Sequence, residues 1–286
     1  MLRKLIKHEW KATWMLPSFL CIFIILITGI SCVACAAPLL GNVKGFTVQS
    51  IILLLLFIFN IILLIFSYVA VLIYFIYRFY KNLFTKEGYL MHTLPTTAGN
   101  LILSKLFCAV TWLLITSLIT YFSIFALSYT ALDVIMKSAG KGSALELFTA
   151  FLHTYREISA IFIQYAGINL GTAILLLILM TIAGCISGML LPYMCFAIGH
   201  LLKKHQVAAS IGFYLLSIII VSSFTSFMSL PAAMKPDMNP KGLALLIAPM
   251  ASTFRLYGIF YIISILFSII FFFTTKYIIS KKLNLN

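Results

Sequence analysis

The stretch Val48–Ile76, VQSIILLLLFIFNIILLIFSYVAVLIYFI, decides the fold of this chain. It holds no Asp, Glu, Lys or Arg, and Asn60 is the polar exception within its run of Ile, Leu and Phe. The hydrocarbon core of a bilayer is about 30 Å thick, so a helix that crosses it needs about 20 mostly apolar residues. We therefore expect this stretch to form a membrane-spanning helix.

Further apolar runs of similar length lie on both sides of it. Hydrophobic residues make up 63% of the 286 residues and charged residues 9%, whereas soluble domains average about 45–50% and about 25%. Strands of a membrane β-barrel would show alternating polarity over ~10 residues, and no such segments occur. We predict an all-α integral membrane protein, a single transmembrane domain over residues 1–286, with spans at about 16–38, 48–76, 101–128, 161–199, 207–228 and 254–279.

Residues 1–15 are amphipathic, with Leu2, Leu5, Ile6, Trp10 and Trp14 at helical spacing between basic residues. This pattern favours an interfacial helix along the membrane surface, and the alternative is a basic flank of the first span. The apolar run that follows is longer than the ~7–15 residues of a signal peptide core. We therefore expect a retained span there.

The distribution of charge predicts the orientation. The net charge is +14, but the cations lie at the ends of apolar runs, which indicates membrane topology rather than nucleic-acid binding. Thirteen of the 20 Lys and Arg lie before the first span, in loops 77–105 and 199–206, or in the tail from Lys276 onwards. The positive-inside rule then places both termini in the cytosol, with loop 129–160 outside.

The region before the last span contains four prolines and a short apolar patch. The patch, Leu243–Ala248, is too short to cross the bilayer. We predict that residues 229–252 form a broken, re-entrant or interfacial segment buried against protein. In the fourth run, which is too long for one straight crossing, Pro192 is expected to introduce a kink.

The chain lacks an energy source of its own. No P-loop sequence GxxxxGK[ST] is present, and the span interiors hold no Asp, Glu, Lys or Arg of the kind that ion-coupled carriers use. Asn60, Gln164 and Asn169 could line a path or could bond a neighbouring helix. We expect no enzymatic activity and no cofactor in this chain.

Two glycine pairs at i and i+4, Gly167 with Gly171 and Gly184 with Gly188, are spaced as at close helix–helix interfaces. They are candidate dimer contacts. Cys32 and Cys35 form a CxxC, but it has neither the βαβ context of a redox motif nor a second ligand pair for a metal. We interpret the cysteines as small apolar helix residues and expect no metal site.

The segment Arg78–Pro95, RFYKNLFTKEGYLMHTLP, combines cations with aromatic and aliphatic residues. A helix with an aromatic face and a charged rim suits a small docking interface. The alternative is an interfacial loop whose side chains snorkel.

This segment, followed by a span that opens LILSKL, resembles the first cytoplasmic loop of the six-span permease subunits of bacterial ABC-2-type exporters. The resemblance implies a coupling helix at 78–95 that sits in a groove of a separate ATPase subunit. The ATPase-coupling residues would be Arg78, Lys81, Lys86, Glu87, Gly88, Tyr89 and Leu90.

The resemblance also implies the partners: an ABC ATPase that holds ATP and Mg, and a second permease copy or paralogue, in a bacterial cell membrane. The expected function is export of a hydrophobic or amphipathic substrate, such as an antimicrobial or toxin-like peptide. The alternative is a non-transporting immunity or sensor protein that binds a peptide at its outer loops.

Overall fold

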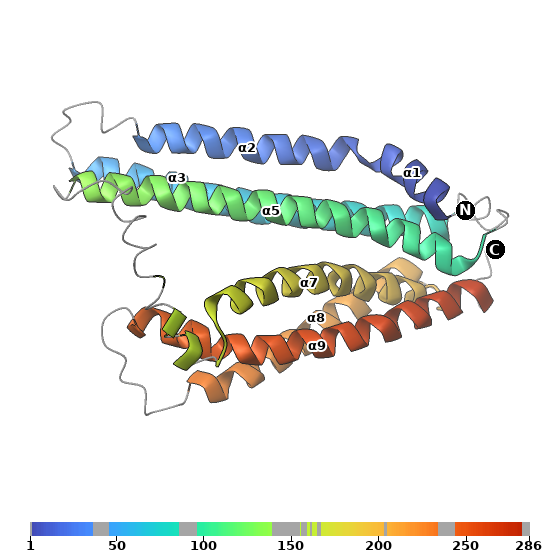
Figure 1. The fold of residues 1–286 in the computed structure, drawn as a ribbon. Helices are drawn as coiled ribbons and strands as arrows, with labels where there is room; N and C mark the ends of the chain where they lie inside the picture. Colours follow the sequence, from blue (N-terminus) through green and yellow to red (C-terminus); the bar gives the residue numbers. More distant parts are fainter. Residues whose placement is uncertain are drawn as a thin grey trace. The chain divides into compact units, whose positions relative to one another are not determined.

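The computed structural model describes residues 2–36, 46–85, 96–138, 155, 159–160, 162–164, 167–202, 205–233 and 244–281. Within these ranges the regular structure is helical, and the main elements are α1 (Leu2–Thr13), α2 (Met15–Ala36), α3 (Phe46–Phe84), α5 (Ala98–Ser138), α7 (Leu170–Gly199), α8 (Gln206–Ala233) and α9 (Ala244–Lys281). All but α1 are long and apolar enough to cross a membrane. The six expected spans are thus found as six long apolar helices (Figure 1).

Several span boundaries differ from those expected. Helix α3 continues eight residues past the expected end, to Phe84, and α5 continues to Ser138, into the expected outer loop. Residues 229–233 belong to α8 and residues 244–252 to α9. The predicted re-entrant segment between them falls partly outside the described residues and stays a prediction.

The fourth span begins later than the apolar pattern suggested, at Leu170 instead of about 161. Gly167 has a φ of 72°, in the left-handed region that interrupts a right-handed helix, and Asn169 is extended at φ −71° and ψ 153°. Helix α7 then runs through Pro192 to Gly199 as one helix. Apolar composition overestimated its length because hydropathy does not register a single backbone reversal.

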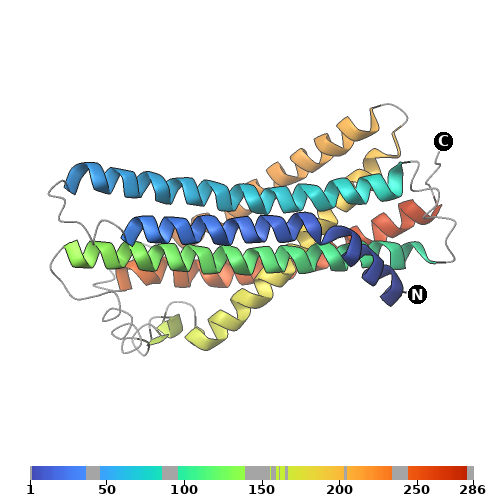
Figure 2. The same ribbon diagram turned by 90° about the horizontal axis from the view of Figure 1, so that it is seen from above.

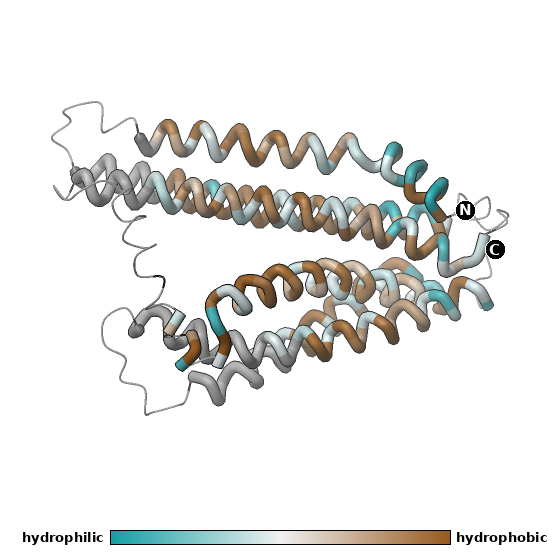
Figure 3. Tube along the Cα trace, in the orientation of Figure 1, coloured by the Kyte–Doolittle hydropathy of each residue, from teal (hydrophilic) through white to brown (hydrophobic). Residues whose placement is uncertain are grey.

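A bend at Trp14 separates α1 from α2. Pro17 lies four residues after Thr13, and a proline has no amide hydrogen to donate to that carbonyl while its ring crowds it. The amides of Trp14 and Ser18 still donate to the carbonyls of Trp10 and Trp14, each at 3.1 Å. The chain therefore changes direction without a loop, and the polar helix α1 leads directly into the apolar helix α2 (Figure 3).

The chain forms two compact units. The N-terminal unit comprises residues 7–74 and 111–154, so it holds residues 7–13 of α1, all of α2, and most of α3 and α5. Its described helices run side by side (Figures 1 and 2). Asn60 of α3 is 1% exposed and its amide nitrogen donates to the Ser31 hydroxyl of α2. Cys21 Sγ of α2 lies 3.9 Å from Thr116 Oγ1 of α5.

The other unit comprises residues 1–6, 75–110 and 155–286. We call it the C-terminal unit because it holds α7, α8 and α9. Helix α7 packs against both α8 and α9, and α8 also contacts α9. A Cβ added to Gly184 of α7 would lie 3.4 Å from the Tyr261 ring of α9, and one added to Gly258 of α9 would lie 3.4 Å from Met180 of α7. Small residues thus let α7 and α9 approach each other closely.

Most serine and threonine hydroxyls of these helices donate to a carbonyl of their own helix, three or four residues earlier. Examples are Ser67 to Leu63 at 2.7 Å, Thr116 to Trp112 at 2.8 Å and Thr275 to Phe271 at 2.7 Å. Large apolar side chains such as Phe19, Ile30 and Ile219 are 64–68% exposed. The apolar side chains thus face outward, and the hydroxyls are satisfied by their own helix. Both features suit a lipid environment, which offers polar groups no water to bond.

Candidate functional site

The predicted ATPase-coupling residues divide into two groups in the structure. Arg78 is half-buried and Lys81 exposed, both in the last turns of α3. Lys86, Glu87, Gly88, Tyr89 and Leu90 lie outside the described residues. The structure therefore describes how the chain enters and leaves the predicted coupling segment, and the coupling role of these residues stays a prediction.

The end of α3 is helical because its apolar residues share one face. Phe75, Phe79 and Leu83 recur every four residues and are 3%, 1% and 0% exposed. Side chains four residues apart lie one above the other on a helix, so they form a continuous stripe. Packing of this stripe extends the helix into the segment that composition had assigned to a polar loop.

An aromatic cluster joins α3 to α7 within the C-terminal unit. It consists of Phe79, Tyr80 and Phe84 of α3 with Tyr193, Phe196 and His200 of the α7 end. The rings of Phe79 and Tyr193 are stacked, with centroids 3.6 Å apart and planes at 7°. The Tyr80–Phe196 and Phe84–His200 centroids are 5.6 Å and 4.8 Å apart. Aromatic pairs contribute about 0.5–1.5 kcal/mol each beyond their buried area, so this cluster holds the two helix ends together.

The position of His200 in the aromatic cluster determines the protonation of its imidazole ring. It caps the carboxyl end of α7, and its backbone amide donates to the Phe196 carbonyl at 3.1 Å. Burial lowers the pKa of its imidazole below the ordinary value of 6.5, because the charged form loses hydration. The ring is therefore neutral at neutral pH and packs as an aromatic group.

The end of α7 is also fixed to the start of α8. A Cβ on Gly199 would lie 2.8 Å from both the backbone nitrogen and Cα of Ser210, closer than real side chains approach. After the turn, His205 has a φ of 55°, and the Ala209 amide donates to its carbonyl at 2.9 Å. The α7–α8 turn is thus a tight corner directly beside the aromatic cluster.

The start of α5, where the chain leaves the predicted coupling segment, is anchored to the same unit. The Thr97 hydroxyl accepts from the Asn100 amide at 3.4 Å, in the manner of an N-cap. Gly99 is buried, and a Cβ there would lie 3.4 Å from Cε of Lys276 on α9. Leu101 and Ile102 are 2% and 0% exposed. The residues on either side of 86–95 therefore both belong to the C-terminal unit.

The candidate path-lining residues have different surroundings. Asn60 is buried and bonds Ser31 of α2 and the Leu56 carbonyl of its own helix, the latter at 3.1 Å. It thus bonds a neighbouring helix, one of the two roles considered for it. Gln164 and Asn169 are exposed, and the Asn169 carbonyl accepts from the Thr172 hydroxyl at 2.6 Å.

The glycine pairs also differ. Gly167 precedes α7, so it does not share a helix face with Gly171, whereas Gly184 and Gly188 both lie within α7. Gly184 faces Tyr261 of the same chain, and an added Cβ at Gly188 or Gly171 would meet nothing within 4 Å. A role in dimer formation stays a prediction for these positions.

Two charged residues are buried in places where the sequence pattern did not single them out. Glu9 of α1 is 4% exposed and Lys105, near the start of α5, is 5% exposed. Lys105 falls within the third expected span, at 101–128, and its position in that run was the available signal. Tyr193 and His200 were also missed, because their importance arises from α3, more than 100 residues earlier in the chain.

No group of three or more His, Cys, Asp and Glu side chains that could hold a metal occurs among the described residues. Comparison with known proteins finds no matching family model, no similar curated protein and no similar solved structure. The class of the chain is therefore set by its own features. Six long apolar helices, preceded by a short amphipathic helix, are consistent with a multi-pass α-helical membrane protein.

Proposed function

We propose that this chain is the membrane permease subunit of an ATP-driven exporter of the ABC-2 kind. Two such permeases, identical or paralogous, would work with two separate ATPase subunits in a bacterial cell membrane. The substrate class is hydrophobic or amphipathic, such as an antimicrobial or toxin-like peptide. ATP and Mg would bind the partner ATPase, and both termini of the permease would be cytosolic.

The observation that carries the proposal is the aromatic cluster between the ends of α3 and α7. The cluster lies immediately before residues 86–95, and the helix after them is packed in the same unit through Gly99, Leu101 and Ile102. A docking element must transmit force to the spans to be useful. Movement of residues 86–95 by an ATPase would shift the end of α3 and, through the stacked rings, α7.

The decisive experiment measures ATP hydrolysis by the partner. The genes on either side of the gene for this chain are first searched for an ATP-binding-cassette protein. That protein is expressed together with the chain, purified, and assayed in lipid. We expect co-purification and a permease-dependent change in ATP turnover. If the chain neither retains an ATPase nor changes its turnover, the proposal is wrong, and peptide binding without ATP would instead favour the sensor alternative.

A charge reversal tests the docking residues. Glu87→Lys should lower permease-dependent ATP turnover while the amount of protein in the membrane stays at the wild-type level, because a carboxylate at the rim of a docking surface pairs with the partner. Glu157→Lys, in the expected outer loop, is the matched control and should leave turnover unchanged. Equal turnover in both variants would remove Glu87 from the proposed interface.

A further inference from the structure

The amphipathic helix α1 places its cations on one side. At 100° per residue, Arg3, Lys7, Lys11 and Lys4 fall within an arc of about 100°, and all four are exposed. Glu9, the only acid of the helix, lies on the opposite side and is 4% exposed. The exposed face of α1 therefore carries positive charge without an acid to neutralise it.

Aromatic and apolar side chains continue this face toward the membrane. Trp10, at the edge of the cationic arc, is 36% exposed and stacks on Trp112 of α5 with centroids 5.2 Å apart. Trp14 and Met15, at the bend, are 54% and 77% exposed. Tryptophan prefers the headgroup level of a bilayer. Trp10 and Trp14 therefore indicate that the adjacent cations of α1 lie at the level of the headgroups.

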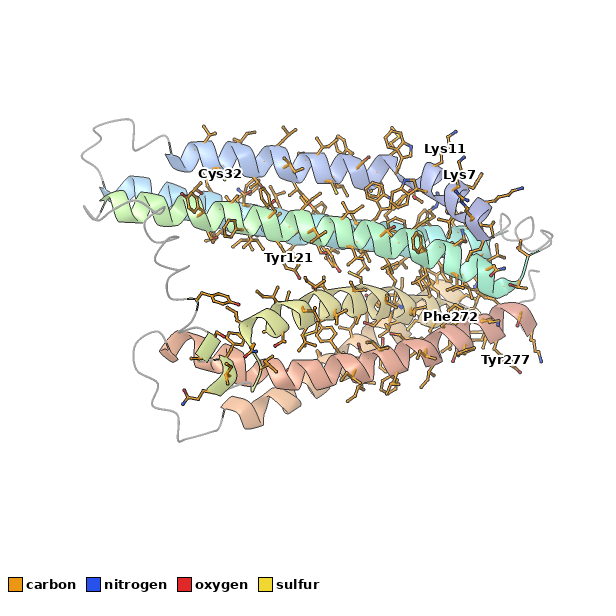
Figure 4. The ribbon with its side chains drawn as sticks, in the orientation of Figure 1. Lys7, Lys11, Cys32, Tyr121, Phe272 and Tyr277 are labelled. Atoms are coloured by element: carbon orange, nitrogen blue, oxygen red, sulfur yellow. The ribbon has the colours of Figure 1, made fainter. Side chains whose placement is uncertain are left out.

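The bend at Trp14 keeps the cations close to that level. Helix α1 has 12 residues, so it is about 18 Å long, and it joins the span α2 without a loop. Lys11 and Lys7 lie one and two turns from the bend, and their side chains project away from the helices (Figure 4). Both are therefore within reach of phosphate groups at the membrane surface.

From these observations we infer that the cationic arc of α1, with Trp10 and Trp14, is a binding surface for anionic phospholipid headgroups. A nucleic acid or an acidic protein would match the charge but not the adjacent exposed Trp14 and Met15, whereas a phospholipid offers a phosphate beside an acyl chain. Each lysine near an anionic bilayer strengthens association by about fivefold. This inference does not depend on an ATPase partner.

The three tryptophans of the chain, Trp10, Trp14 and Trp112, all lie at this corner, so intrinsic fluorescence reports on it. The full chain is reconstituted in phosphatidylcholine bilayers that contain either brominated phosphatidylglycerol or brominated phosphatidylcholine at equal mole fraction. We expect the anionic lipid to quench the fluorescence more strongly. The excess should disappear at about 1 M salt, where the screening length falls to about 3 Å.

Matched variants test whether Lys7 and Lys11 cause the excess quenching by the anionic lipid. Lys7→Gln with Lys11→Gln should abolish the excess quenching, Lys7→Arg with Lys11→Arg should retain it, and Lys281→Gln, an exposed cation on α9, should not change it. Equal quenching by the two lipids in the wild type overturns the proposal, and so does an excess that survives the glutamine pair or high salt. If the glutamine pair fails to fold, the arginine pair and the salt series decide. Lysines that serve only an acidic protein partner would show no excess in these protein–lipid bilayers, which also overturns it.

Discussion

Gly199 illustrates how one residue determines a helix corner. The Ser210 backbone occupies the space that any side chain at position 199 would need, at 2.8 Å. We predict that Gly199→Ala lowers the free energy of unfolding by about 1–3 kcal/mol, the usual cost of overpacking. The midpoint of thermal unfolding in detergent measures this loss.

Gly188→Ala is the control for that prediction. It adds the same methyl group to the same helix at a position with nothing within 4 Å. Its unfolding midpoint should equal or exceed the wild-type value, because alanine favours a helix over glycine by up to about 1 kcal/mol. Ser210→Ala removes the hydroxyl that also meets the added methyl group, but it leaves the Ser210 nitrogen and Cα 2.8 Å from it. It should therefore rescue Gly199→Ala only in part. A Gly199→Ala protein as stable as Gly188→Ala would contradict the packing of α7 on α8.

For single residues, the sequence predicted which positions are unusual, but it did not predict the contacts that those residues make. Asn60 was recognised as polar within an apolar span, and the structure shows that its partner is Ser31 of the preceding span. The left-handed φ of Gly167 was not predictable, because glycine adopts many conformations. The charge of Lys105 assigns it to loop 77–105, and its burial results from the packing of the start of α5, which charge alone does not encode.

At the scale of elements, the stacking of α3 on α7 is the contact to test. Phe79→Leu keeps an apolar side chain but removes the ring that stacks on Tyr193 at 3.6 Å and meets the Phe84 ring at 5.8 Å. We predict a loss of about 0.5–1.5 kcal/mol for each ring pair, seen as a lower unfolding midpoint. Permease-dependent ATP turnover should fall as well, since the cluster is the proposed route of force.

Phe122→Leu makes the same change on α5 at a side chain that is 73% exposed, and it should alter neither stability nor turnover. If Phe79→Leu is destabilised yet fully coupled, the cluster holds the fold but does not transmit force.

Apolar run length predicted that six spans exist. It could not place their ends, because α3 is extended by rings on α7, a contact that no local pattern encodes.

At the scale of the whole molecule, the charge distribution predicts that both termini are cytosolic. A green fluorescent protein fused after Asn286 should fluoresce in intact bacteria, since it folds in the cytosol, and alkaline phosphatase inserted after Ala139 should be active because that loop is expected outside. A dark fluorescent protein fusion together with an inactive phosphatase fusion would show that both termini lie outside. Residues 86–95 would then be beyond the reach of a cytosolic ATPase.

The self-bonded hydroxyls of the spans have a consequence for biosynthesis. Because Ser67, Thr116 and Thr275 each donate to their own helix, a newly made span can leave the translocation channel for lipid without waiting for a partner to satisfy its polar groups. The amide of Asn60 makes an additional bond to Ser31. Its partner helix α2 precedes α3 in the chain, so the Ser31 acceptor has already been synthesised when the Asn60 donor leaves the ribosome.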